Sequence, residues 1–191
     1  MKRVSLLILL LFVLSPISSF AQQKMKAPDN FRGIKWGTDI KTLSGFKDSG
    51  WVPNLIPEYK DVKRYRRDEN KKVGEIKVDG IEYAFYKGKF YAGCIFFKDA
   101  NKYSILKDAL EQKYGKGKKF VVEGAKEFEN CFRWDVGDID ILISYTKSEG
   151  VGRLKYEYKP IDSECMKEIF KHLDKKEEKQ EKVIRKLKDD L

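Results

Sequence analysis

The chain of 191 residues contains one histidine, three cysteines and five prolines. Nucleophilic catalysis by serine or cysteine usually needs an imidazole base, and the one imidazole available belongs to His172, which lies among lysines. The cysteine spacings match no metal motif, and a zinc site would need all three thiols together with that imidazole. The nucleophile motif G-x-S-x-G is also missing. We therefore assign no catalytic residue, no metal ligand and no cofactor from the sequence.

Long apolar runs are equally scarce, and the chain has one, at its start. Lys2 and Arg3 precede the apolar run 6–14, and small side chains lead up to Ala21. This pattern predicts a cleavable signal peptide over residues 1–21. The run is far shorter than the ~20 residues that cross a bilayer, and no later segment is apolar enough to span one. We expect an exported protein, located in the periplasm or secreted, with no transmembrane segment after cleavage.

Positive charge is in excess, with a formal net charge of +10, and it is concentrated in one stretch. Residues 60–72 contain seven basic and three acidic side chains, with Tyr65 between them. Such a stretch suits an anionic surface, although a solvated edge strand and loop would explain it equally well. Nucleic acid is not expected, because an exported protein seldom meets it. The candidate anion-binding residues are Lys60, Lys63, Arg64, Arg66, Arg67, Lys71 and Lys72.

Apolar residues that alternate with polar ones predict antiparallel strands in two groups. Turns at Asp79-Gly80, Lys87-Gly88 and Gly137-Asp138 separate several of them. The alternating segments are residues 75–78, 81–86, 90–97, 132–136, 139–145 and 154–158.

Each group of strands is followed by a segment with helical periodicity. Asp99 or Asn101 can begin the first helix, which ends before Gly115, and Asp162 can begin the second. The apolar stripes are Ile105, Leu106, Ala109 and Leu110 in the first helix, and Cys165, Met166, Ile169, Phe170 and Leu173 in the second.

These elements predict an α+β fold. We expect one antiparallel β-sheet with helices packed on one face, built from a pseudo-repeat of a strands-then-helix unit. Behind the signal peptide the chain divides into a flexible lead-in over residues 22–30, a single domain over residues 31–173 and a charged, helical C-terminal tail over residues 174–191.

Apolar residues in the tail are few and occupy a narrow face. They are Val183, Ile184, Leu187 and Leu191, set among many charges. We interpret the tail as a solvated helical extension, because so narrow a face does not demand a partner's groove.

The cysteines suggest one disulfide if the chain enters an oxidising compartment. Cys165 lies on the apolar stripe of its helix and should point at the sheet, where Cys94 and Cys131 lie on strands. A disulfide of Cys165 with Cys94 or Cys131 is therefore the candidate pairing. The alternative is three inert buried thiols.

Three aspartates lie close together in the sequence and are candidates for a metal site or for acid–base catalysis. Asp135, Asp138 and Asp140 lack the oxygen-rich loop and the following glutamate of a dedicated calcium site. Asp138 and Asp140 also fit the outward face of a strand. A pair of carboxylates doing hydrolysis is left as an alternative to binding.

Several short motifs resemble a family of exported bacterial proteins of unknown function that begin F-x-G-x-x-W-G. They are the opening segment 31–38, the hairpin 81–97, the helix end 110–115 and a strand bearing Trp134. The resemblance implies a bacterial envelope protein and carries over no catalytic or binding residue. Within the opening segment, Trp36 is a candidate ligand platform or, flanked by glycines, an anchor in the core.

From the sequence we expect an exported, non-enzymatic binding or envelope-associated protein. Its partner would be an anionic envelope component or another exported protein. The alternatives are a small hydrolase with an unrecognised carboxylate pair, and an assembly or inhibitor protein that acts through its tail.

Overall fold

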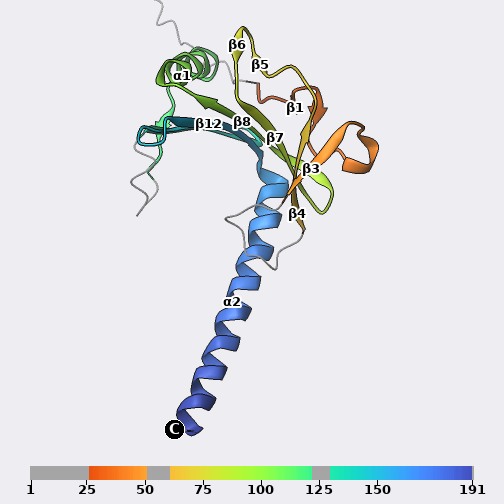
Figure 1. Cartoon of the computed structure of the whole chain (residues 1–191), viewed down its shortest axis with the longest axis vertical. Helices are drawn as coiled ribbons and strands as arrows, with labels where there is room; N and C mark the ends of the chain where they lie inside the picture. Colours follow the sequence, from red (N-terminus) through yellow and green to blue (C-terminus); the bar gives the residue numbers. More distant parts are fainter. Residues whose placement is uncertain (1–25, 51–60, 122–129, 191) are drawn as a thin grey trace, which may run out of the picture.

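The computed structural model describes residues 26–50, 61–121 and 130–190 (Figure 1). The expected signal peptide and residues 22–25 of the lead-in lie outside the described residues. No helix among the described residues is long and apolar enough to cross a membrane.

Eight strands form one antiparallel sheet in the order β3-β4-β7-β8-β12-β11-β10-β9 (Figure 1). The sheet and its helices confirm the predicted α+β class. The strands of this sheet are β3 (Phe46–Gly50), β4 (Val62–Arg67), β7 (Gly80–Tyr86), β8 (Lys89–Lys98), β9 (Lys118–Lys119), β10 (Asn130–Val136), β11 (Ile139–Thr146) and β12 (Val151–Tyr158). Two short antiparallel pairs lie outside it, β1 (Asn30–Phe31) with β2 (Ile34–Lys35) and β5 (Lys72–Val73) with β6 (Ile76–Lys77).

The sheet order has the symmetry that the strands-then-helix interpretation requires. Four strands of the first half and four of the second meet at the centre, where β8 pairs with β12 and Ile95 lies opposite Leu154. One helix follows each half, α1 (Ala100–Tyr114) after β8 and α2 (Lys159–Asp190) after β12.

The helices do not share one face of the sheet, and this part of the prediction is wrong. Leu106 and Leu110 of α1 join the large core on one face, whereas Cys165 and Ile169 of α2 join a smaller cluster on the other. The connections explain the difference. Asp99, with φ 91°, turns the chain between β8 and α1 and accepts a hydrogen bond from an α1 amide, but α2 follows β12 with no residue between them.

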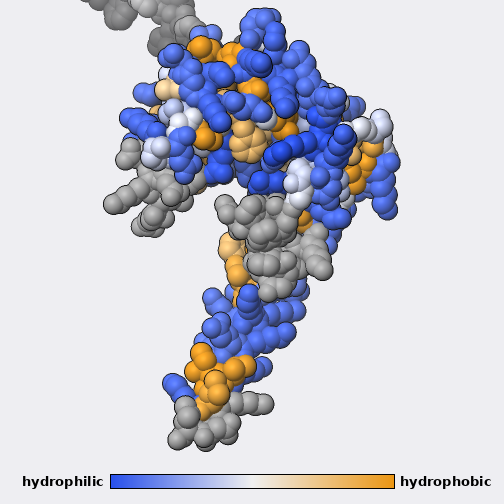
Figure 2. Space-filling view, viewed as in Figure 1, coloured by the Kyte–Doolittle hydropathy of each residue, from blue (hydrophilic) through white to orange (hydrophobic). Residues whose placement is uncertain are grey.

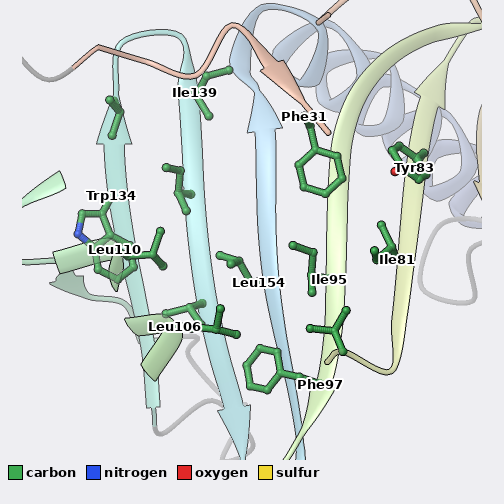
Figure 3. Packing of buried hydrophobic residues seen from close by; sticks show 14 of the residues in the cluster. Phe31, Ile81, Tyr83, Ile95, Phe97, Leu106, Leu110, Trp134, Ile139 and Leu154 are labelled. Carbon is green, nitrogen blue, oxygen red and sulfur yellow. The ribbon is translucent and has the colours of Figure 1, made fainter. Parts of the chain in front are cut away.

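The large core fills the α1 face (Figure 3). Its apolar side chains come from alternate positions of the strands, because successive residues of a strand point to opposite faces of the sheet. Packing is close enough to require glycine at the sheet centre, because a Cβ on Gly152 would lie 2.1 Å from the ring of Phe97. Phe97 itself is completely buried. Members labelled in Figure 3 include Ile81, Ile95, Phe97, Leu106, Trp134 and Leu154.

Two strands of the main sheet, β3 and β9, were not predicted. β3 has the sequence FKDSG, which offers no alternation of apolar residues, and β9 is only two residues long. β4 is dominated by basic residues and lies in the stretch for which the sequence allowed a solvated edge strand. The pairing of β3 with β4 makes β3 the edge of the sheet, so β4 is second from the edge.

Candidate functional site

A pocket of about 270 Å³ lies on the face of the sheet opposite α1, beneath the first turns of α2. Its walls come from β4, β7, β8, β11, β12 and α2, elements that include segments far apart in the sequence. The charged residues that line it are Arg64, Glu82, Arg153, Lys155, Glu157 and Asp162.

Strand alternation places these charges. In β12 the apolar or aromatic residues Leu154 and Tyr156 face the large core, so Arg153, Lys155 and Glu157 face the pocket. Strand pairing across β8 and β7 then brings Arg64 of β4 to the same pocket. Basic residues from two distant segments therefore meet there.

Glu82 is the most deeply buried carboxylate of this face, with its side chain 9% exposed. Arg64 Nη1 lies 3.4 Å from Glu82 Oε2, and Arg66 donates a hydrogen bond of 2.9 Å from Nε to Oε1. Two guanidinium groups thus share a single carboxylate, which leaves an excess of positive charge at this side of the pocket.

On the opposite wall, Lys155 forms an ion pair with Glu157, and Arg153 Nε donates a 3.3 Å hydrogen bond to Ser144. Asp162, in the first turn of α2, forms no side-chain hydrogen bond with any other residue that the structure describes to offset its burial. Burial, with a further contribution from the Glu157 charge, raises the pKa of Asp162 to about 6. Asp162 therefore takes up a proton at a pH only slightly below neutral.

The remaining lining of the pocket is apolar. Phe96, Met166 and Ile169 lie around the charged groups, together with two cysteines, Cys94 and Cys165. Burial raises the pKa of the Cys94 thiol to about 11 and that of Cys165 to about 12, so both are protonated at neutral pH. The pocket can hold a ligand that has both a negative group and an apolar part.

As predicted, Cys165 points at the sheet, where it is 2% exposed. All three cysteines are free thiols in the structure. Cys94 lines the same pocket as Cys165, whereas Cys131 lies on β10, three strands away from β8. The disulfide stays a prediction.

The predicted basic stretch does not form one patch, but the structure brings part of it together, because Arg66, Arg67 and Lys71 line a second pocket of about 450 Å³. Arg64 lines the pocket, and Arg66 reaches Glu82 beside it. Lys63 and Lys71 are exposed, and Lys72 lies 3.5 Å from Glu75 in an ion pair. Lys60 lies outside the described residues.

Arg67 faces the other side of the sheet and belongs to an internal network. Glu69 accepts hydrogen bonds from Arg67, Arg32 and Tyr83, and the Arg67 guanidinium lies 5.1 Å from the centre of the Tyr83 ring. Burial alone would raise the pKa of Glu69, but these hydrogen bonds outweigh it and lower that pKa. Arg67 therefore supports the fold here, and it shares the Glu69 carboxylate with Arg32.

Trp36 takes the anchoring role rather than that of an open platform. Its ring stacks on Phe90 with centroids 5.0 Å apart, and it lies nearly parallel to the ring of Tyr158. Its Nε1 donates a 2.8 Å hydrogen bond to the carbonyl of Pro28. These contacts fix Trp36 between the opening segment and the sheet.

The aspartates around the β10–β11 turn are engaged with cations of this chain. Lys159 Nζ donates a 2.6 Å hydrogen bond to Asp135, and Arg133 Nε donates one of 2.8 Å to Asp140. The lysine lowers the pKa of Asp135. This pair of aspartates is thereby neutralised by neighbouring side chains.

Comparison with protein-family models, with curated proteins and with solved structures finds no match. Function is therefore inferred from the geometry of the pocket.

Of the candidate site residues named from the sequence, Arg64, Cys94 and Cys165 line the pocket, but the other charged lining residues were not identified as site residues. One signal was available, since the apolar face assigned to 154, 156 and 158 implies that 153, 155 and 157 share the opposite face. No local pattern, however, indicates that β12 and β4 contribute to a common pocket, because that depends on the order of the strands.

Proposed function

We propose that this chain is an exported, non-enzymatic binding protein whose ligand is an anionic amphiphile, a molecule with a negatively charged headgroup joined to an apolar chain. The observation that carries the proposal is the meeting of Arg64, Arg153 and Lys155 in one pocket that also has apolar walls. A phosphate or carboxylate headgroup would bind the guanidinium groups, and the apolar chain would lie against residues such as Phe96 and Ile169. Envelope lipids have this chemistry.

The test is co-sedimentation of the purified protein with lipid vesicles. We expect binding to vesicles that contain phosphatidylglycerol, weak binding to pure phosphatidylcholine, and a decrease with salt that leaves part of the binding intact. Arg153→Gln should reduce binding severalfold. Arg185→Gln removes the same charge from an exposed position on the distal part of α2 and should leave binding unchanged.

Two results would contradict the proposal. One is no retention on anionic vesicles at low salt. The other is an equal loss of binding in the two arginine variants, because a loss that follows net charge alone does not involve the pocket.

A second candidate function, a small hydrolase, is favoured by one observation. Glu157 and Asp162 line the same pocket, and a carboxyl whose pKa is raised to about 6 is typical of a general acid. In this interpretation Glu157 and Asp162, rather than the aspartates near β10, form the carboxylate pair. It predicts hydrolysis of at least one chromogenic glycoside by the wild-type protein and loss of that activity in Asp162→Asn; equal rates in both proteins would end it.

A further inference from the structure

Beyond its first turns α2 leaves the sheet and continues as a free-standing helix (Figure 1). Cys165 and Ile169 fasten its start to the sheet, and every residue from 170 to 185 is exposed. Hydrophobic side chains nevertheless gather at two places along the projecting part, separated by a hydrophilic stretch (Figure 2). An exposed helix of this length needs an explanation for those side chains.

The exposed apolar residues follow the spacing of a coiled coil. Phe170 and Leu173 are three apart, as are Ile184 and Leu187, and the two pairs are separated by two heptads. They are 56%, 36%, 46% and 56% exposed, respectively. A stripe made mainly of a and d positions, with Val183 beside it at position g, is narrow, and this is the width of the seam between two coiled helices. The apolar face of α2 is too narrow to require a groove, but its width matches the seam of a coiled coil. It therefore favours a second helix of the same kind as the partner.

We propose that α2 mediates self-association, and that two copies of this chain pair through the segment 170–187 as a parallel, in-register coiled coil. With Phe170 at position a, the polar residues Glu177 and Gln180 occupy the central a and d positions. Polar residues in the seam lower affinity and fix the register, so the dimer is a weak, reversible one.

The charges beside the seam select the parallel orientation. In a parallel pair, Lys176 at position g faces Glu181 at position e of the other helix, and this attraction occurs twice. In the antiparallel pair that matches the same apolar layers, Asp174 faces Glu181 and Lys167 faces Lys188, so like charges meet at both contacts along the flank formed by the e positions. The parallel pair has one unfavourable contact, between the two Glu177 side chains, and these side chains have to turn toward solvent.

Sedimentation velocity of the purified protein, from low to high micromolar concentration, tests the proposal. We expect the mass to rise from that of one chain to that of two. Ile184→Asn should abolish the rise. Val183→Asn, a change at a neighbouring residue of similar exposure outside the a and d positions, should weaken it much less.

Charge reversal tests the orientation. Lys176→Glu and Glu181→Lys should each weaken the dimer about fivefold, and an equimolar mixture of the two variants should restore it, because opposite charges then face each other. Replacing Glu177 and Gln180 together by leucine should tighten it more than tenfold.

A wild-type protein that stays monomeric at high micromolar concentration would overturn the proposal and leave the seam to a different partner. Tighter association of Glu181→Lys alone would overturn the parallel arrangement, since that result is expected of antiparallel helices. Both outcomes are independent of vesicle binding, which concerns the other end of α2.

Discussion

The two faces of the central sheet are built on opposite principles. On the α1 face, aromatic and branched side chains pack into one continuous core that includes fully buried residues such as Phe97 and Ile141. On the opposite face, α2 covers a small cluster, and charged side chains surround a pocket. The same strands supply both faces, because successive residues point to opposite sides.

This contrast separates the face that provides most of the stability from the face that carries the proposed binding site. The large core buries most of the apolar surface and therefore provides most of the stability of the fold. The face with the pocket contributes less to stability, and it is free to carry charges such as those of Arg64 and Arg153 that a packed core would not tolerate. Substitutions on the two faces of one strand should consequently behave differently.

The largest expected effect comes from two adjacent phenylalanines of β8. Phe97→Ala empties a fully buried site and should lower the free energy of unfolding by about 4 kcal/mol. Phe96→Ala removes the same atoms from the partly exposed pocket side and should cost about 1 kcal/mol. Urea denaturation measures both, and equal losses would show that the two faces do not differ as described.

A smaller effect is expected at the sheet centre. Gly152→Ala places a methyl group against the buried ring of Phe97 and should destabilise the protein by about 2 kcal/mol. Gly80→Ala is the matched control, because the added carbon would lie 3.6 Å from Phe96, an ordinary contact. The double variant Gly152→Ala with Phe97→Ala should lose less than the sum of the single losses. Additive losses would contradict the close approach.

The charged face makes a prediction about pH. Because the pKa of Asp162 is raised in the folded state, folding is opposed by ionisation, and this cost appears as pH rises from about 4 to about 6. Asp162→Asn should therefore gain about 1 kcal/mol at neutral pH, since partial solvation reduces the full effect, and nothing below about pH 4. Asp174→Asn, on the exposed part of α2, is the control. A gain that is the same at both pH values would refute this account.

The smallest expected effect concerns ligand affinity. Protonation of Asp162 removes a negative charge from the pocket, so affinity for anionic vesicles should increase about two- to threefold between about pH 7.5 and about pH 5. The increase should disappear in Asp162→Asn. Persistence of the full pH dependence in that variant would assign it to another group.

Local patterns predicted the elements better than their arrangement. The stripes located both helices and Asp99 located the start of α1, whereas Asp162 was wrong as the cap of α2, which begins at Lys159. Alternation located the strands from β7 to β12 apart from the short β9, because this signal is contained in a few consecutive residues. β3 escaped because its sequence does not alternate. The side of the sheet that α2 covers depends on the direct connection from Tyr158 of β12 to Lys159 of α2, with no loop residue between the strand and the helix. Periodicity does not encode this detail.

The pocket was less predictable than the fold. Charge clustering pointed to the segment 60–72, yet alternation sends Arg64 and Arg67 to opposite faces, and the pocket gains its other cations from β12. A run of like charges in sequence is therefore not a surface patch when the run forms a strand. Long-range strand order decides which charges meet.

The central claim is that ligand binds on the pocket face, and NMR of the arginine side chains tests it most directly. On titration with lyso-phosphatidylglycerol, a single-chain anionic amphiphile, the Nε–H signals of Arg64 and Arg153 should shift in a saturable manner. Those of Arg67, on the α1 face, and Arg185, on the distal part of α2, should stay in place. Shifts confined to Arg67 and Arg185, or no saturable shift at any arginine, would contradict the account.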